Sequence, residues 1–91
     1  MALLVSFTPA TLTRMQYDEA IKRLQAAGAW VPKGLQYHAC YGSEGKLRVA
    51  EVWESRQAFE AFGKTLMPIL QQIGINPGQP EVSEIQNIVK G

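Results

Sequence analysis

The periodicity of apolar residues changes in the middle of the chain, where a predicted strand leads directly into a predicted helix. Between Leu47 and Glu54 successive side chains alternate between two faces, as they do in a β-strand. One face carries Leu47, Val49, Glu51 and Trp53, and the other carries Arg48, Ala50, Val52 and Glu54. The sequence therefore predicts a strand that ends at Trp53.

Beyond this strand the apolar residues recur at every third or fourth position, namely Phe59, Phe62, Leu66, Leu70 and Ile73. This spacing indicates one face of an amphipathic helix, and the hydroxyl of Ser55 suits the N-cap. Pro68 lies inside the pattern and lacks the amide that a helix needs. We therefore expect either a kinked helix or two short helices that meet near Met67.

A first helix is predicted nearer the N-terminus. Thr11 or Thr13 suits its N-cap, and Thr13 with Gln16 fits the capping-box pattern. Gly28 suits the position just after the helix, because glycine takes the left-handed conformation cheaply.

Three further segments have the composition or the alternation of strands. They are Ala2–Thr8, Gly34–Tyr41 and Glu81–Val89. Residues 42–45 have glycine at both ends and predict a hairpin turn between the two central strands.

The resulting order of elements is β-α-β-β-α-β, in a single domain that covers residues 1–91. Right-handed crossovers fold this order into a ferredoxin-like α+β sandwich, in which two helices cover one face of a four-stranded antiparallel sheet. The other face is then left bare, and so short a chain has nothing else to cover it. Because exposed apolar patches mark interfaces, we expect a homodimer that buries this face.

Composition narrows the classes of partner and cofactor. The net charge is only +1 at pH 7 with no basic stripe, so nucleic acid is not an expected partner. No stretch approaches the ~20 apolar residues of a membrane span. The single Cys40 excludes internal disulfides and, with no signal peptide in the sequence, favours a cytoplasmic protein. Phosphate-loop, paired-histidine and Cys-x-x-Cys motifs are absent, so no cofactor and no metal are expected.

His38 is the only histidine and the first candidate for chemistry. A tight turn through residues 42–45 would place His38 opposite Val49 and Gln36 opposite Glu51, so that His38 and Glu51 are diagonal neighbours on one face. A carboxylate beside an imidazole fixes its tautomer and suits it to act as a general base. We therefore predict His38 and Glu51 as catalytic residues. An error of one residue in the register would move His38 to the opposite face.

Trp53, Gln36 and Phe62 are predicted to bind the substrate, with Trp53 as an aromatic wall for a planar ligand. Plainer interpretations stay open. A solitary histidine on an edge strand is commonly a surface or satisfied polar residue, and a tryptophan at a core position is commonly only core. An ion pair with a basic residue of its own strand would equally account for Glu51.

The residues also resemble a known family. Residues 51–55 (EVWES), 58–62 (AFEAF) and 66–68 (LMP) resemble the dimeric α/β-barrel superfamily and, within it, small proteins related to antibiotic-biosynthesis monooxygenases. The resemblance implies that two sheets pair face to face into a barrel, with a small-molecule pocket in each subunit. Some members oxygenate aromatic substrates without metal or flavin, and others degrade haem. Gln86 stands where such relatives often carry a histidine.

Two functions follow, and a third is disfavoured. The first is a cofactor-independent, monooxygenase-like enzyme for a small aromatic or apolar molecule, with His38 as base and Glu51 orienting it. The alternative is a non-catalytic homodimeric module that binds a small molecule. An RNA-recognition domain would need exposed aromatic residues on its third strand, which residues 46–52 lack.

Overall fold

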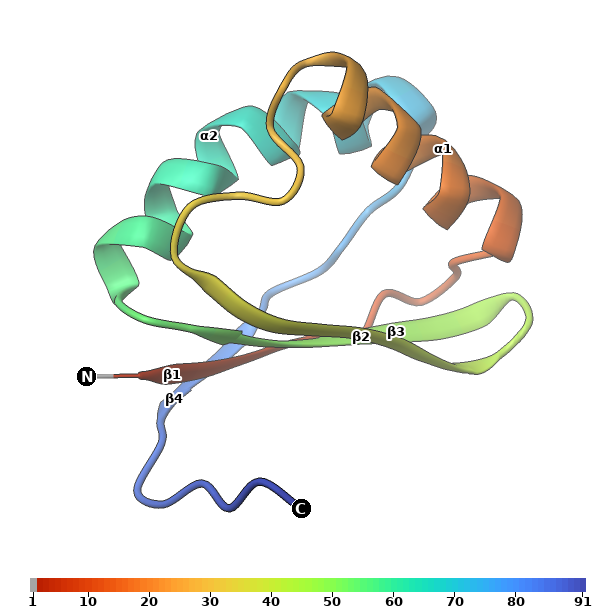
Figure 1. Cartoon of the computed structure of the whole chain (residues 1–91). Helices are drawn as coiled ribbons and strands as arrows, with labels where there is room; N and C mark the ends of the chain where they lie inside the picture. Colours follow the sequence, from red (N-terminus) through yellow and green to blue (C-terminus); the bar gives the residue numbers. More distant parts are fainter. Residues whose placement is uncertain (1) are drawn as a thin grey trace.

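The computed structural model describes residues 2–91, and its elements follow the predicted order. The strands are β1 (Leu3–Phe7), β2 (Leu35–Ser43), β3 (Lys46–Trp53) and β4 (Glu81–Glu84), and the helices are α1 (Arg14–Ala26) and α2 (Arg56–Ile73). All strand pairs are antiparallel, in the order β2-β3-β1-β4. Both helices lie on the same face of the sheet (Figure 1). The predicted ferredoxin-like sandwich is confirmed.

The helix ends agree with the sequence. Thr13 caps α1 with both hydrogen bonds of a capping box to Gln16, and Ser55 caps α2 by accepting from the amide of Ala58. Helix α2 is a single helix in which Pro68 is accommodated, so the alternative of two short helices is wrong. It ends at Ile73 and is capped by Gly74, whose φ of 87° is left-handed.

The turn between β2 and β3 is two residues shorter than predicted. Ser43 lies opposite Lys46, so the connection is made by residues 44 and 45 alone. This shift of two residues keeps His38 and Cys40 on their predicted face, because strand side chains alternate with a period of two. It places His38 directly opposite Glu51, where the sequence had placed them diagonally.

Strand β4 is shorter than the predicted Glu81–Val89. Its only neighbour is β1, and its last partnered residue, Glu84, lies opposite Leu3 at the start of β1. The amide of Ile85 still donates to the carbonyl of Ala2 at 3.0 Å, and the pairing ends there. Alternation continues in the sequence, but the residues beyond have no paired strand.

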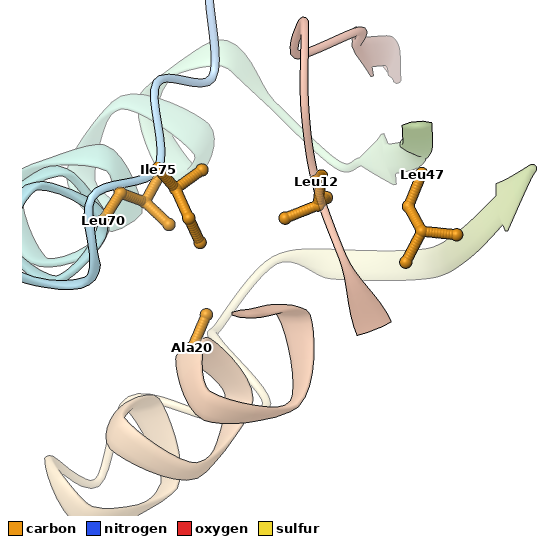
Figure 2. Packing of buried hydrophobic residues seen from close by; sticks show 5 residues of the cluster. All are labelled: Leu12, Ala20, Leu47, Leu70 and Ile75. Carbon is orange, nitrogen blue, oxygen red and sulfur yellow. The ribbon is translucent and has the colours of Figure 1, made fainter. Parts of the chain in front are cut away.

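The core fills the space between the helices and the sheet in two clusters. One holds Leu12, Ala20, Leu47, Leu70 and Ile75 (Figure 2). The other holds Val5, Leu24, Trp53 and Phe62. Figure 2 shows that the first cluster draws on both helices, β3 and two connecting segments. The sheet face that these clusters cover is the one that carries His38 and Glu51.

The other face of the sheet has no helix. Leu4, Tyr37 and Tyr41 remain 42%, 45% and 47% exposed. The C-terminal tail leaves β4 toward this side of the sheet (Figure 1). The Nζ atom of Lys90 lies 5.2 Å from the centre of the Tyr37 ring. The tail thus contacts part of the face that the sequence had left bare, and it leaves the three large side chains about half exposed.

Candidate functional site

A cavity of about 80 Å³ lies between the sheet and the helices. Most of its wall is apolar and comes from β1, α1, β3, α2 and the connecting segments, including Phe7, Leu24, Val49, Phe62, Leu66 and Ile75. Three titratable side chains share this wall, namely Tyr17, His38 and Glu51. Hardly any polar surface of the wall is open to the cavity, because these three side chains turn their polar atoms toward one another.

Glu51 anchors the polar part of the wall. The residue is only 3% exposed, and a buried carboxylate is costly unless its oxygens are hydrogen-bonded. One carboxylate oxygen, Oε2, lies 2.7 Å from Nδ1 of His38. The other, Oε1, accepts a hydrogen bond of 3.0 Å from the indole Nε1–H of Trp53. Both oxygens therefore have donors, and the carboxylate is fixed in orientation from two sides.

His38 is held at both of its ring nitrogens. With Nδ1 at the carboxylate of Glu51, Nε2 lies 2.7 Å from the hydroxyl oxygen of Tyr17. We assign the neutral ring as the Nδ1–H tautomer from these partners, because a carboxylate only accepts while a phenol donates. The ring of Trp30 packs edge-on against the imidazole, with centroids 5.0 Å apart, and the Tyr17 ring lies nearly parallel to it at 5.9 Å. The imidazole is thus locked in place by packing as well as by hydrogen bonds.

The four side chains form one chain of hydrogen bonds. It runs from the hydroxyl of Tyr17 to His38, on to Glu51, and ends at Trp53. A phenol, an imidazole and a carboxylate in this order resemble the nucleophile–base–orienter arrangement of hydrolytic triads, in which the carboxylate fixes the tautomer and stabilises the imidazolium. The arrangement can take up a proton at the cavity wall and place the resulting positive charge beside Glu51.

Burial favours the protonated form of two weak acids near the site, the Tyr17 phenol and the Cys40 thiol. It raises the pKa of Tyr17 above its ordinary value of 10.0, and the charges that Cys40 and Glu51 carry when ionised raise it further. The Tyr17 phenol therefore keeps its proton at neutral pH and can donate it to His38. Burial also raises the pKa of the Cys40 thiol, which keeps the sulfur in its protonated and weakly nucleophilic form.

The predicted site residues divide into three groups. His38, Glu51 and Phe62 lie together on the cavity wall. Trp53 is fully buried behind Glu51, so it contacts the carboxylate and not the cavity. Gln36 is exposed. An irregularity between Leu35 and Tyr37 interrupts the alternation of side chains along β2, so Gln36 does not share the face of His38. Its placement there contradicts the shared face that the sequence analysis had given it.

Two residues of the site escaped the sequence analysis. Tyr17 lies in α1 with its side chain toward the sheet, and a tyrosine that faces a core needs a partner for its hydroxyl. That requirement, combined with a lone histidine on the sheet, was the signal available. Trp30 lies in the segment between α1 and β2, and nothing in its local sequence pattern indicates that this segment packs against His38.

Other site types find no support in the described part of the chain. Among residues 2–91 no group of three or more His, Cys, Asp or Glu side chains could hold a metal ion. None of the helices within that range is long and apolar enough to cross a membrane. Gln86, at the position where relatives often carry a histidine, is exposed beyond the end of β4.

Comparison with known proteins shows likeness in fold and not in sequence. No family model and no curated protein matches the chain. The structural-genomics protein YJCS is 14% identical with a TM-score of 0.66, over 94% of this chain and 100% of that one. SnoaB, a cofactor-independent oxygenase from Streptomyces nogalater, is 12% identical with a TM-score of 0.64, over 99% and 96%.

A third solved structure has the same fold. A putative antibiotic biosynthesis monooxygenase from Chloroflexus aurantiacus is 11% identical with a TM-score of 0.63, over 100% of both chains. Identities this low establish the fold alone. The chain has the ferredoxin-like fold of antibiotic-biosynthesis-monooxygenase-like proteins, as the sequence resemblance implied.

Proposed function

We propose that the chain is a cofactor-independent, monooxygenase-like enzyme that acts on a small aromatic or apolar molecule. One observation carries the proposal: a hydrogen-bonded chain of Tyr17, His38 and Glu51 on the wall of an otherwise apolar cavity. A satisfied core histidine needs neither a carboxylate that is itself anchored nor a position beside open space. The solved oxygenase of the same fold, SnoaB, supports the proposal by analogy.

The chemistry begins with removal of a proton from the substrate. His38 takes up this proton at Nε2 by way of the Tyr17 hydroxyl that is bonded to it, and the carboxylate of Glu51 stabilises the imidazolium through Nδ1. The substrate carbanion or enolate that remains is rich in electrons and reacts with O2. One oxygen atom becomes a carbonyl oxygen of the product, and the other leaves as water with the two hydrogens that the substrate loses.

The size and lining of the cavity select the substrate. About 150 Å³ holds a benzene ring in an engineered apolar cavity. The cavity beside His38, at about 80 Å³, is smaller, so a single ring fits when a half-buried side chain such as Leu66 shifts. The apolar wall favours a substrate that is mostly apolar, and His38 and Glu51 favour a substrate with one acidic proton. The substrate is therefore small, with at most one ring inside the wall.

The assay that tests this proposal follows consumption of dissolved O2 with a panel of one-ring phenols and small enolisable ketones. Turnover that produces a carbonyl product without added metal or flavin supports the enzyme. The alternative, a binding module, is favoured by the fact that His38 has both nitrogens already occupied within the protein. Ligands that bind in the cavity with no O2 consumption across the panel would reject the enzyme in favour of that module.

We also propose that the protein is a cytoplasmic homodimer, and the open sheet face supports the dimer, in which the two copies would pair these faces. Leu4 sits on this face and is 42% exposed. Light scattering is expected to give twice the 10.1 kDa of one chain. Leu4→Lys should lower that mass, because it buries a charge in the interface. Met15→Lys, at an 81% exposed position of α1, is the matched control and should leave it unchanged. A wild-type protein of monomeric mass at micromolar concentration would contradict the dimer.

A further inference from the structure

The segment between α1 and β2 covers one side of the cavity. Strand β2 forms an edge of the sheet, because the strand order is β2-β3-β1-β4. Residues 27–34 pass from the helix layer down to this edge (Figure 1). Trp30 lies in the middle of this segment and lines the cavity, with its ring centroid 5.0 Å from that of His38. Under this cover the His38 side chain is only 14% exposed.

The backbone of this segment is held mainly at its two ends. The amide of Ala29 donates to the carbonyl of Leu24 at 2.8 Å, and the carbonyl of Gly34 accepts from the amide of Glu54 at 2.8 Å. In the part of the chain that the structure describes, the amides of residues 30, 31, 33 and 34 donate to no other backbone group. Segments with so few backbone hydrogen bonds open at a low free energy.

Glycines with a left-handed backbone stand at both ends of the segment. Gly28 has a φ of 71° and Gly34 a φ of 90°. Lids move about a few terminal residues that absorb large changes of φ and ψ, and glycine has the widest range of both. A Cβ atom at Gly34 would lie 2.5 Å from the Cβ of Ala58, whereas one at Gly28 would meet no atom within 4 Å. Gly34 is therefore the anchored end of the segment, and Gly28 is the free end.

An open groove separates the outer side of the segment from α2. Val31 and Lys33 line one side of this groove, and Gln57 and Ala61 of α2 line the other. Val31 is 68% exposed. The segment thus contacts the cavity through Trp30, while the groove on its other side leaves space in which it can move.

We propose that residues 29–33 form a lid over the cavity, hinged at Gly28 and Gly34, with the Trp30 side chain as its plug. The structure shows the closed state, in which Trp30 covers the imidazole and hardly any polar surface is open to the cavity. When the lid opens, Trp30 leaves His38 and the cavity is joined to solvent. The lid goes beyond the proposed function, because it admits a molecule to His38 whether that molecule is then oxidised or only bound.

The first test uses the wild type. The chain has two tryptophans, so 15N NMR gives two indole N–H signals. Lid opening on the μs–ms timescale should produce relaxation dispersion at the Trp30 indole and at the lid amides, with one common rate. Trp53 is fully buried and hydrogen-bonded to Glu51, so its indole should show none. No dispersion at Trp30, or dispersion of the same rate at Trp53, would overturn the lid.

The second test measures how fast diethyl pyrocarbonate acylates His38, which is the only histidine. The reagent is bulkier than benzene, which an engineered cavity of about 150 Å³ holds, so it does not fit the closed cavity of about 80 Å³. Acylation therefore requires the open lid. Because minor states of this kind are populated at about 0.1–10%, Trp30→Ala should raise the rate by about tenfold or more.

A pair of hinge variants tests the motion itself. Asparagine accepts the left-handed conformation but has a narrower range of φ than glycine, so Gly28→Asn fits the closed lid and restricts the open one. We expect acylation of His38 to slow by about twofold to fivefold. Gly78→Asn is the matched control, since Gly78 also has a φ of 71° and open surroundings but lies between α2 and β4.

Two results of the acylation experiment would contradict the lid. One is a rate that Trp30→Ala does not raise, and the other is an equal effect of Gly28→Asn and Gly78→Asn. Neither test requires turnover, so a failure to consume O2 rejects the proposed enzyme and leaves the lid as it is.

Discussion

Replacing Trp53 with alanine is expected to lower the free energy of unfolding by about 3–5 kcal/mol, the usual cost of truncating a fully buried large aromatic residue. The Trp53 side chain is 0% exposed, and its ring centroid lies 5.7 Å from that of Phe59 and 5.5 Å from that of Phe62. For a small domain this is a large share of the total stability. The measurement is urea unfolding at a fixed protein concentration, since association would otherwise shift the apparent stability.

A conservative variant separates the packing of Trp53 from its hydrogen bond. Trp53→Phe keeps most of the apolar ring but removes the donor to Oε1 of Glu51. We expect this variant to cost about 1–3 kcal/mol, the penalty for leaving a buried acceptor without its partner. If Trp53→Ala were no more costly than Trp53→Phe, the residue would not hold the core as described.

Replacing His38 with alanine is expected to lower kcat/KM by about 10²–10⁴-fold, the usual contribution of a general base. The imidazole is the base of the network, and its positive charge would lie beside the Glu51 carboxylate. The measurement is O2 consumption with the best substrate found in the panel, over a range of pH. Unchanged turnover in His38→Ala would reject the role of His38 as base.

Glu51→Gln is the companion variant for this prediction. It keeps the size of the side chain and an oxygen that can accept from His38, but it removes the negative charge that stabilises the imidazolium. A loss of rate in Glu51→Gln with little loss of stability would assign the effect to charge. Tyr41→Phe, on the open sheet face, provides a control in which turnover should be that of the wild type.

The pattern of apolar residues was sufficient for the fold because each helix and strand has its own local signal. The capping box at Thr13, the cap at Ser55 and the glycine at position 28 set the helix ends near their predicted positions. The faces of the sheet also followed from alternation. His38 and Glu51 therefore came together even though the predicted pairing was two residues off, since a shift of two preserves the face.

The predictions that were wrong or missing concern features that depend on contacts between segments distant in sequence. The end of β4 is set by where β1 begins, and local alternation in residues 85–89 carries no information about it. The irregularity at Leu35 that moves Gln36 is invisible in the sequence of β2 alone. Tyr17 and Trp30 reach His38 only through the packing of α1 and its connector on the sheet, so their roles could not be read from spacing.

The central claim is that the single imidazole is held in one tautomer between a carboxylate and a phenol at the cavity wall. The most direct test is 15N NMR of protein labelled at histidine, recorded over a pH series in the wild type and in Tyr17→Phe. We predict that the neutral ring is protonated at Nδ1 alone, and that Nε2 has the shift of a hydrogen-bonded acceptor which changes in Tyr17→Phe. A neutral ring protonated at Nε2, or two tautomers in rapid exchange that Tyr17→Phe does not affect, would contradict the account.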